Sequence, residues 1–99
     1  MDNKTSKTIG DSIEETKEFH TRLLRAVNNP VRRKILRALK DGEATVESLQ
    51  VKTGLEPKNL EWHLSILEWG FCIEKVLKDG KSKYKLTQEG KVVDFINEK

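Results

Sequence analysis

The pattern of polar and apolar residues predicts a helix after a short polar lead-in. Residues 1–10 lack an apolar run, so we expect a flexible tail, followed by a single folded domain over residues 11–99. The helix is predicted to begin near Ser12, because Ser12 and Glu15 have the spacing of a capping box. Its apolar positions recur at roughly helical spacing and are Ile13, Phe19, Leu23, Ala26 and Val27.

A second helix is predicted to follow directly, with one apolar face and one basic face. Asn29 and Pro30 favour its start, since asparagine caps free amides and a proline in the first turn sacrifices no needed donor. We expect it to run to about Lys40, where an Asp-Gly pair ends it. The predicted inner face consists of Val31, Ile35, Ala38 and Leu39. The predicted outer face is a basic stripe of Arg33, Arg37 and Lys40.

Two further helices separated by a tight turn are predicted next. The third covers Val46–Thr53, with Gly54 as its left-handed stop, and the fourth runs from Pro57 to about Trp69, before Gly70. Projected at about 100° per residue, one side of the fourth helix is apolar and belongs in the core. That side holds Leu60, Leu64 and Leu67. The opposite side holds Lys58, Trp62, Ser65 and Trp69, flanked by Asn59 and His63.

After Gly70 the pattern changes to alternation, which predicts a β-hairpin. Its strands are expected at Phe71–Lys78 and Lys81–Thr87, around the turn pair Asp79-Gly80. In the second strand, lysines alternate with packing residues, so one face should present three ammonium groups. A last helix, at about Gln88–Asn97, carries Val92, Val93, Phe95 and Ile96. The predicted fold is therefore mainly α, with about five helices and one small β-hairpin.

Composition narrows the possible classes of protein. A chain of 99 residues makes one domain with a modest core. It has neither an apolar run long enough for a membrane span nor a leader-like opening, so we expect a cytoplasmic protein without a membrane partner. The single cysteine, Cys72, excludes an internal disulfide but leaves open a disulfide between two subunits. No nucleophile–base pair, carboxylate dyad or phosphate-binding glycine loop is evident, so we expect no enzyme.

The distribution of charge is more informative than its total of +3. Residues 75–85 contain five lysines and one aspartate, which gives this segment a net charge of +4. Residues 30–44 are also basic, whereas residues 45–74 are net acidic. Because contact with phosphate requires a local cluster of positive charge, the hairpin and the basic stripe are the candidate nucleic-acid contacts.

Five segments, in this order, resemble the winged helix-turn-helix regulators of the ArsR type, and more loosely those of the MarR type. AVNNPVRRKILRALKDG is similar to the opening of the family's second helix, and TVESLQVKTGL to its third helix and turn. NLEWHLSIL is similar to the recognition helix, with a His-Leu pair at the family's position. KDGKSKYKLTQEG is similar to the wing and the Leu-Thr-x-x-Gly start of the last helix. The resemblance covers residues 26–90 and implies a winged helix-turn-helix fold.

The resemblance also implies a transcriptional regulator that binds double-stranded DNA. The helix at residues 57–69 would enter the major groove, and the wing, residues 78–85, would lie on phosphates or in the minor groove. The implied DNA contacts are Lys58, Asn59, Trp62, His63, Lys81, Ser82 and Lys83. Lys58 suits guanine or phosphate, Asn59 suits adenine, and Trp62 suits a sugar or a thymine methyl group.

Regulators of this type usually bind as two-fold dimers, through their first and last helices. The implied interface residues of a homodimer are Phe19, Leu23, Val92, Phe95 and Ile96. Alternatively, these side chains pack within one subunit. No metal or other cofactor is expected, because the third helix lacks the cysteine pair of metal-sensing relatives and the two histidines are far apart in sequence.

A second function stays open, that of a winged helix used for protein–protein interaction without sequence-specific DNA binding. Glu61 and Glu68 oppose contact with phosphates, unless Glu61 accepts a hydrogen bond from a cytosine amine. Exposed tryptophans at positions 62 and 69 would also suit a protein partner.

Overall fold

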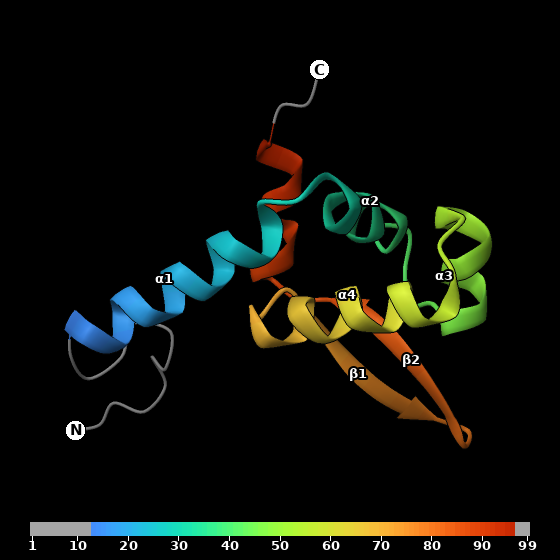
Figure 1. Ribbon diagram of the computed structural model, residues 1–99. Helices are drawn as coiled ribbons and strands as arrows, with labels where there is room; N and C mark the ends of the chain where they lie inside the picture. The colour runs from blue at the N-terminus through green and yellow to red at the C-terminus, as the bar shows by residue number, and fades with distance from the viewer. Residues whose placement is uncertain (1–12, 97–99) are drawn as a thin grey trace.

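In the computed structural model, residues 13–96 are described, and Figure 1 shows their arrangement. The elements are α1 (Ile13–Val27), α2 (Pro30–Ala38), α3 (Val46–Thr53), α4 (Pro57–Trp69), β1 (Ile73–Lys78), β2 (Lys81–Leu86) and the 3₁₀-helix η1 (Glu89–Phe95). The start of α1 and the tip of the hairpin lie at opposite ends of the molecule (Figure 1). The predicted tail, residues 1–10, and the predicted capping residue Ser12 lie outside the described residues.

Capping residues explain where the middle helices begin and end. Asn29 accepts a hydrogen bond from the amide of Arg32, and α2 ends at Ala38, two residues before the predicted end. Thr45 caps α3, and Gly54 ends it with a left-handed φ of 75°. The predicted boundaries of α3 and α4 are confirmed.

The end of α4 uses its glycine in an unexpected way. Gly70 has an ordinary φ of −91°, whereas Phe71 takes the left-handed position at φ 69°. Two hydrogen bonds close the turn, from the Phe71 amide to Glu68 and from the Cys72 amide to Leu67. A Cβ at Gly70 would lie only 2.4 Å from the Cβ of Ala26 on α1. Glycine is therefore needed for helix packing here, and Phe71 accepts a backbone strain of about 1–2 kcal/mol.

The core lies where α2, α3 and α4 meet, with the start of the hairpin beneath them. The predicted inward residues of α4 are all buried: Leu60, Leu64 and Leu67. On α2, Leu36 joins Ile35 and Leu39 in the core, while Val31 and Ala38 are only half-buried, so the inner face of α2 was predicted partly wrongly. In the described residues, no helix is long and apolar enough to cross a membrane.

The hairpin is antiparallel, and an isolated β-bridge attaches it to the loop between α2 and α3. Asp79 and Gly80 both have positive φ, 51° and 76°, as a tight two-residue hairpin turn requires. Tyr84 is buried and exchanges two backbone hydrogen bonds with Ala44, at 2.8 and 3.0 Å. The hairpin therefore has a fixed position relative to the loop between α2 and α3.

The last helix differs from its prediction. A helix was predicted at about residues 88–97; the structure has a shorter 3₁₀-helix over Glu89–Phe95, and residue 97 lies outside the described residues. Thr87 accepts a hydrogen bond from the Gly90 amide and donates one to the carbonyl of Phe71. A Cβ at Gly90 would lie 2.1 Å from the carbonyl oxygen of Cys72. The Leu-Thr-x-x-Gly segment thus packs the start of the last helix against the residues that follow α4.

Candidate nucleic-acid interface

The outer face of α4 is exposed along its length. Lys58, Asn59 and Trp62 all lie on the surface, and Trp62 keeps 58% of its area exposed. Ser65 is also exposed, but its hydroxyl donates to the carbonyl of Trp62 at 2.7 Å and is already engaged. The sequence-predicted face therefore exists as a surface that a groove could receive.

This face is more acidic than a typical phosphate-binding surface. Glu61 and Glu68 are exposed on α4, and Glu56 is exposed at its start. Lys58 is the single lysine or arginine within α4. Attraction to a polyanion must therefore come from another part of the protein.

The hairpin supplies that positive charge, but its lysines are not equivalent. Lys78 forms an ion pair with Glu43 at 3.2 Å, and Lys85 pairs with Glu74 at 3.5 Å. Within the described residues, Lys81 and Lys83 form no salt bridge. Lys81 is exposed and Lys83 is half-buried, so these two ammonium groups are the ones available at the end of the wing.

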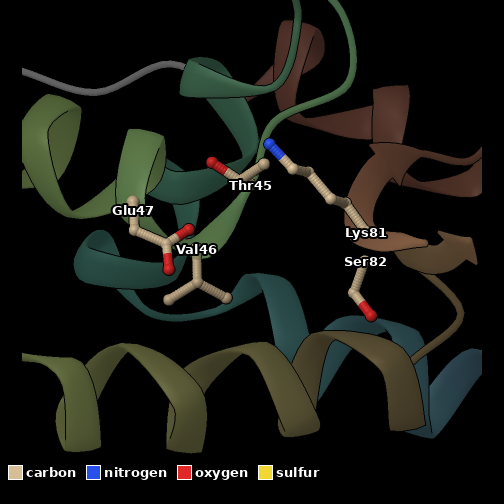
Figure 2. A pocket seen from close by; sticks show the side chains of 5 residues that line it. All are labelled: Thr45, Val46, Glu47, Lys81 and Ser82. Atoms are coloured by element: carbon tan, nitrogen blue, oxygen red, sulfur yellow. The ribbon is translucent and has the colours of Figure 1, made fainter. Parts of the chain in front are cut away.

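The start of β2 lies beside the start of α3. Figure 2 shows an open pocket between them, lined by Thr45, Val46, Glu47, Lys81 and Ser82. Thr45 already uses its hydroxyl as the cap of α3, and the carboxylate of Glu47 makes the pocket partly acidic. Lys81 and Ser82 therefore lie across this pocket from the first turn of α3.

The predicted basic stripe on α2 is engaged in contacts within the protein. Arg33 donates to the carbonyl of Val27 at 2.9 Å. Arg37 donates to the carbonyls of Val93 and Ile96, and Lys40 pairs with Asp94 at 2.6 Å. The interpretation of this stripe as a free phosphate-binding surface is therefore corrected: it joins α2 to the end of α1 and to η1.

Sequence reasoning missed a buried arginine beneath the recognition face. Arg32 is only 8% exposed, and its Nε donates to the carbonyl of Ala26 at 2.8 Å. Its Nη1 lies 3.3 Å from Nδ1 of His63. Burial, and secondarily the charge of Arg32, lowers the pKa of His63 below its ordinary value. The only sequence signal was the position of Arg32 three residues after the cap, on the inward side of α2.

The predicted dimer residues divide into two groups. Phe95 is 85% exposed. Leu23, Val92 and Ile96 are half-buried against the core of the same subunit, and the ring of Phe19 stacks on Phe71 at 4.6 Å. Two further apolar side chains of α1, which were not among the predicted interface residues, are also exposed: Ile13 and Leu24.

Cys72 is fully buried rather than available to a partner subunit. Burial, together with the nearby charge of Glu89, raises the pKa of its thiol to about 12. An intersubunit disulfide would therefore require local unfolding. In the described part of the chain, no group of three histidine, cysteine, aspartate or glutamate residues is arranged to hold a metal ion.

Comparison with known proteins agrees with this geometry. Residues 29–68, from the cap of α2 through most of α4, match the family of bacterial regulatory proteins named arsR. This part of the chain therefore resembles the ArsR family, and the similar solved structures include winged helix-turn-helix regulators of that family. A search of the curated proteins found no significant match to this chain.

Solved structures with the same fold include several regulators. One is the homodimeric winged helix-turn-helix DNA-binding domain of Mb0332 from Mycobacterium bovis, a possible ArsR-family regulator, at 25% identity and a TM-score of 0.72; the match covers 87% of this chain and 81% of that one. NolR from Sinorhizobium fredii has 25% identity, a TM-score of 0.70 and coverage of 96% and 92%. The transcriptional repressor BigR from Xylella fastidiosa has 24% identity, a TM-score of 0.68 and coverage of 84% and 87%.

Proposed function

We propose that this protein is a cytoplasmic transcriptional regulator of the ArsR type that binds double-stranded DNA as a homodimer. The observation that carries the proposal is the pair of unbridged lysines, Lys81 and Lys83, on a hairpin fixed beside a helix-turn-helix. A positive group held at a defined distance from a recognition helix suits the phosphates that flank a major groove.

The proposal divides affinity and specificity between two elements. Lys81, Lys83 and the hydroxyl of Ser82 would bind phosphates or enter the minor groove, and would supply most of the affinity. On α4, Lys58, Asn59 and Trp62 are exposed and would contact base edges. His63 is half-buried with Nδ1 toward Arg32, so it would support this surface from beneath more than contact bases directly. The proposed function needs no metal or other cofactor.

The homodimer would form through α1 and η1. Phe95, Leu24 and Ile13 leave apolar surface exposed on these elements, and the similar domain from Mycobacterium bovis is homodimeric. Light scattering should give a dimer for the native chain and a monomer for Phe95→Glu. Val51→Glu is the matched control, since Val51 on α3 is equally exposed at 85% and should leave the dimer intact. A native monomer at micromolar concentration would refute this part.

The proposal is tested by titrating random duplex DNA at two salt concentrations. A DNA-binding protein loses affinity steeply as salt rises, because bound lysines release counterions from the duplex. Absence of binding at low salt would refute the proposal. In that case the exposed Glu61, Glu68 and Trp69 would favour the second function, a protein-interaction module.

A further inference from the structure

Arg32 links three helices through one guanidinium group. Its Nε donates to the carbonyl of Ala26, and its Nη2 to the carbonyl of Arg25 at 3.2 Å, both in the last turn of α1. Its Nη1 reaches His63 on α4, while its own backbone belongs to the first turn of α2. Arg32 therefore connects the start of α2, the end of α1 and the middle of the recognition helix.

The contact with His63 requires one form of the imidazole. A guanidinium group can donate hydrogen bonds but cannot accept them, so Nδ1 of His63 must be the acceptor. The ring is therefore neutral, with its proton on Nε2. If Nδ1 gained a proton, two donors of like charge would face each other at 3.3 Å. Protonation of His63 is thus incompatible with the contact.

The Arg32–His63 contact reaches the surface through Trp62. The imidazole lies edge-on against the indole of Trp62, with ring centroids 4.8 Å apart. The guanidinium carbon of Arg32 lies 6.0 Å from the centroid of the same indole, at the outer limit of a cation–π contact. Trp62 keeps 58% of its area exposed, so these two contacts hold its ring from the protein side.

We propose that Arg32 and His63 are a positioning pair that holds the indole of Trp62 in one orientation on the exposed face of α4, and that the pair separates when His63 gains a proton. The importance of this pair for DNA recognition rests on the proposed function, but the existence of the pair is independent of that function. Trp62 would then meet DNA already ordered, which lowers the entropic cost of binding.

Among the described residues, Arg32 is the charged group that acts on the imidazole of His63. On α1, Arg22 is held at Trp69, and Arg25 offers its backbone while its side chain is exposed. One turn away on α4 are uncharged residues: Asn59, Leu60, Ile66 and Leu67. Charged side chains of α3 and β1 are exposed, namely Glu47, Lys52, Glu74, Lys75 and Lys78. The buried thiol of Cys72 remains neutral below pH 9.

The test uses Trp62 as its own reporter in the Trp69→Phe background, where it is the single indole of the chain. A protonated imidazole quenches a neighbouring indole more strongly than a neutral one. Fluorescence followed from pH 8 downward should therefore fall in one transition centred below 6.5, the ordinary pKa of histidine. Fluorescence anisotropy should fall over the same pH range, as the released indole gains mobility.

Three variants in that background separate positioning from general stability. His63→Gln retains an acceptor for Arg32 but does not titrate, so it should abolish the pH transition and keep the high anisotropy. Arg32→Lys retains the charge but not the forked geometry, so it should lower the anisotropy at pH 8. Arg25→Lys makes the same chemical change on an exposed side chain nearby and should change neither signal.

A quenching transition that persists in His63→Gln, or an unchanged anisotropy in Arg32→Lys, would overturn the proposal. Circular dichroism identifies a variant that fails to fold, and the His63→Gln arm then decides alone. These titrations contain no DNA, so they are independent of the proposed function. On DNA, Arg32→Lys should weaken binding to a duplex selected from a random pool by about tenfold, comparable with the loss of one base contact, and change random-duplex binding less.

Discussion

The wing lysines give the prediction that the structure defines most quantitatively. Lys81→Ala combined with Lys83→Ala removes the two unbridged ammonium groups of strand β2, and leaves the paired Lys78 and Lys85 and the Tyr84-stacked Lys75 in place. Each lost phosphate contact should reduce the slope of log affinity against log salt by about 0.9, or about 1.8 per protomer for the pair. Over a fourfold rise in salt, the variant should lose about tenfold less affinity per protomer than the native protein.

Fluorescence anisotropy with a labelled random duplex, at several salt concentrations, measures this slope. The matched control is Lys34→Ala combined with Lys91→Ala, which removes the same charge from exposed positions on α2 and η1. The control should keep the native slope, with a small uniform loss of affinity from the lower net charge. Equal slopes for the native protein and the wing variant would show that these lysines do not contact phosphates, and would refute the reasoning.

Three further predictions concern the recognition helix and its supports. Replacing a contacted thymine by deoxyuridine in a selected duplex should weaken binding of the native protein by about fourfold, the value of one buried methyl group. The same replacement should not change the affinity of Trp62→Ala, and an equal loss in both proteins would mean that Trp62 does not contact the methyl. Gly70→Ala should lower Tm by about 5–15 °C, because the new Cβ would lie 2.4 Å from that of Ala26. Adding Ala26→Gly should restore part of the lost Tm, and an unchanged Tm in Gly70→Ala would contradict the packing. Because the pKa of Cys72 is raised to about 12, its neutral thiol stabilises the folded state fully below pH 9, and this stabilisation is lost as pH rises toward 12. Urea unfolding at pH 10.5 should therefore show that the native protein has lost about 2 kcal/mol of unfolding free energy relative to Cys72→Ala. An equal pH dependence of the unfolding free energy in both proteins would contradict the burial of the thiol.

Local signals in the sequence were sufficient to predict most of the fold. Gly54 ends α3 with the left-handed φ that was predicted for it, which is a property of a single residue. Asp79 and Gly80 both take the positive φ that their hairpin turn demands. Each of these features depends on neighbours in the chain, so the sequence alone is informative about them.

Features that depend on distant contacts were predicted wrongly or missed. Gly70 was predicted to follow the end of α4, but the close approach of Ala26 on α1, which requires a glycine there, and the left-handed φ of Phe71 were missed. The last helix was predicted, but its 3₁₀ geometry and the contacts of its start with Thr87 and the carbonyl of Cys72 were missed. Nothing in the local pattern reports these tertiary contacts.

The candidate site shows the same division. The exposure of Lys58, Asn59 and Trp62 followed from the helical projection of α4, because its opposite side forms the core. The role of the arginines did not follow, since a basic stripe has the same sequence pattern whether it faces solvent or binds carbonyls at the ends of other helices. Arg37 and Arg32 both donate to such carbonyls, and only the tertiary structure identifies them.

Selection of bound sequences from a random DNA pool, with the native protein, tests the central claim most directly. A homodimer with one recognition helix per subunit should enrich an inverted repeat, with half-sites about one helical turn apart. The same selection with Trp62→Ala should lose preference at defined positions within each half-site, while the spacing of the half-sites persists. A pool without an enriched motif, from protein that is folded and dimeric, would contradict the account.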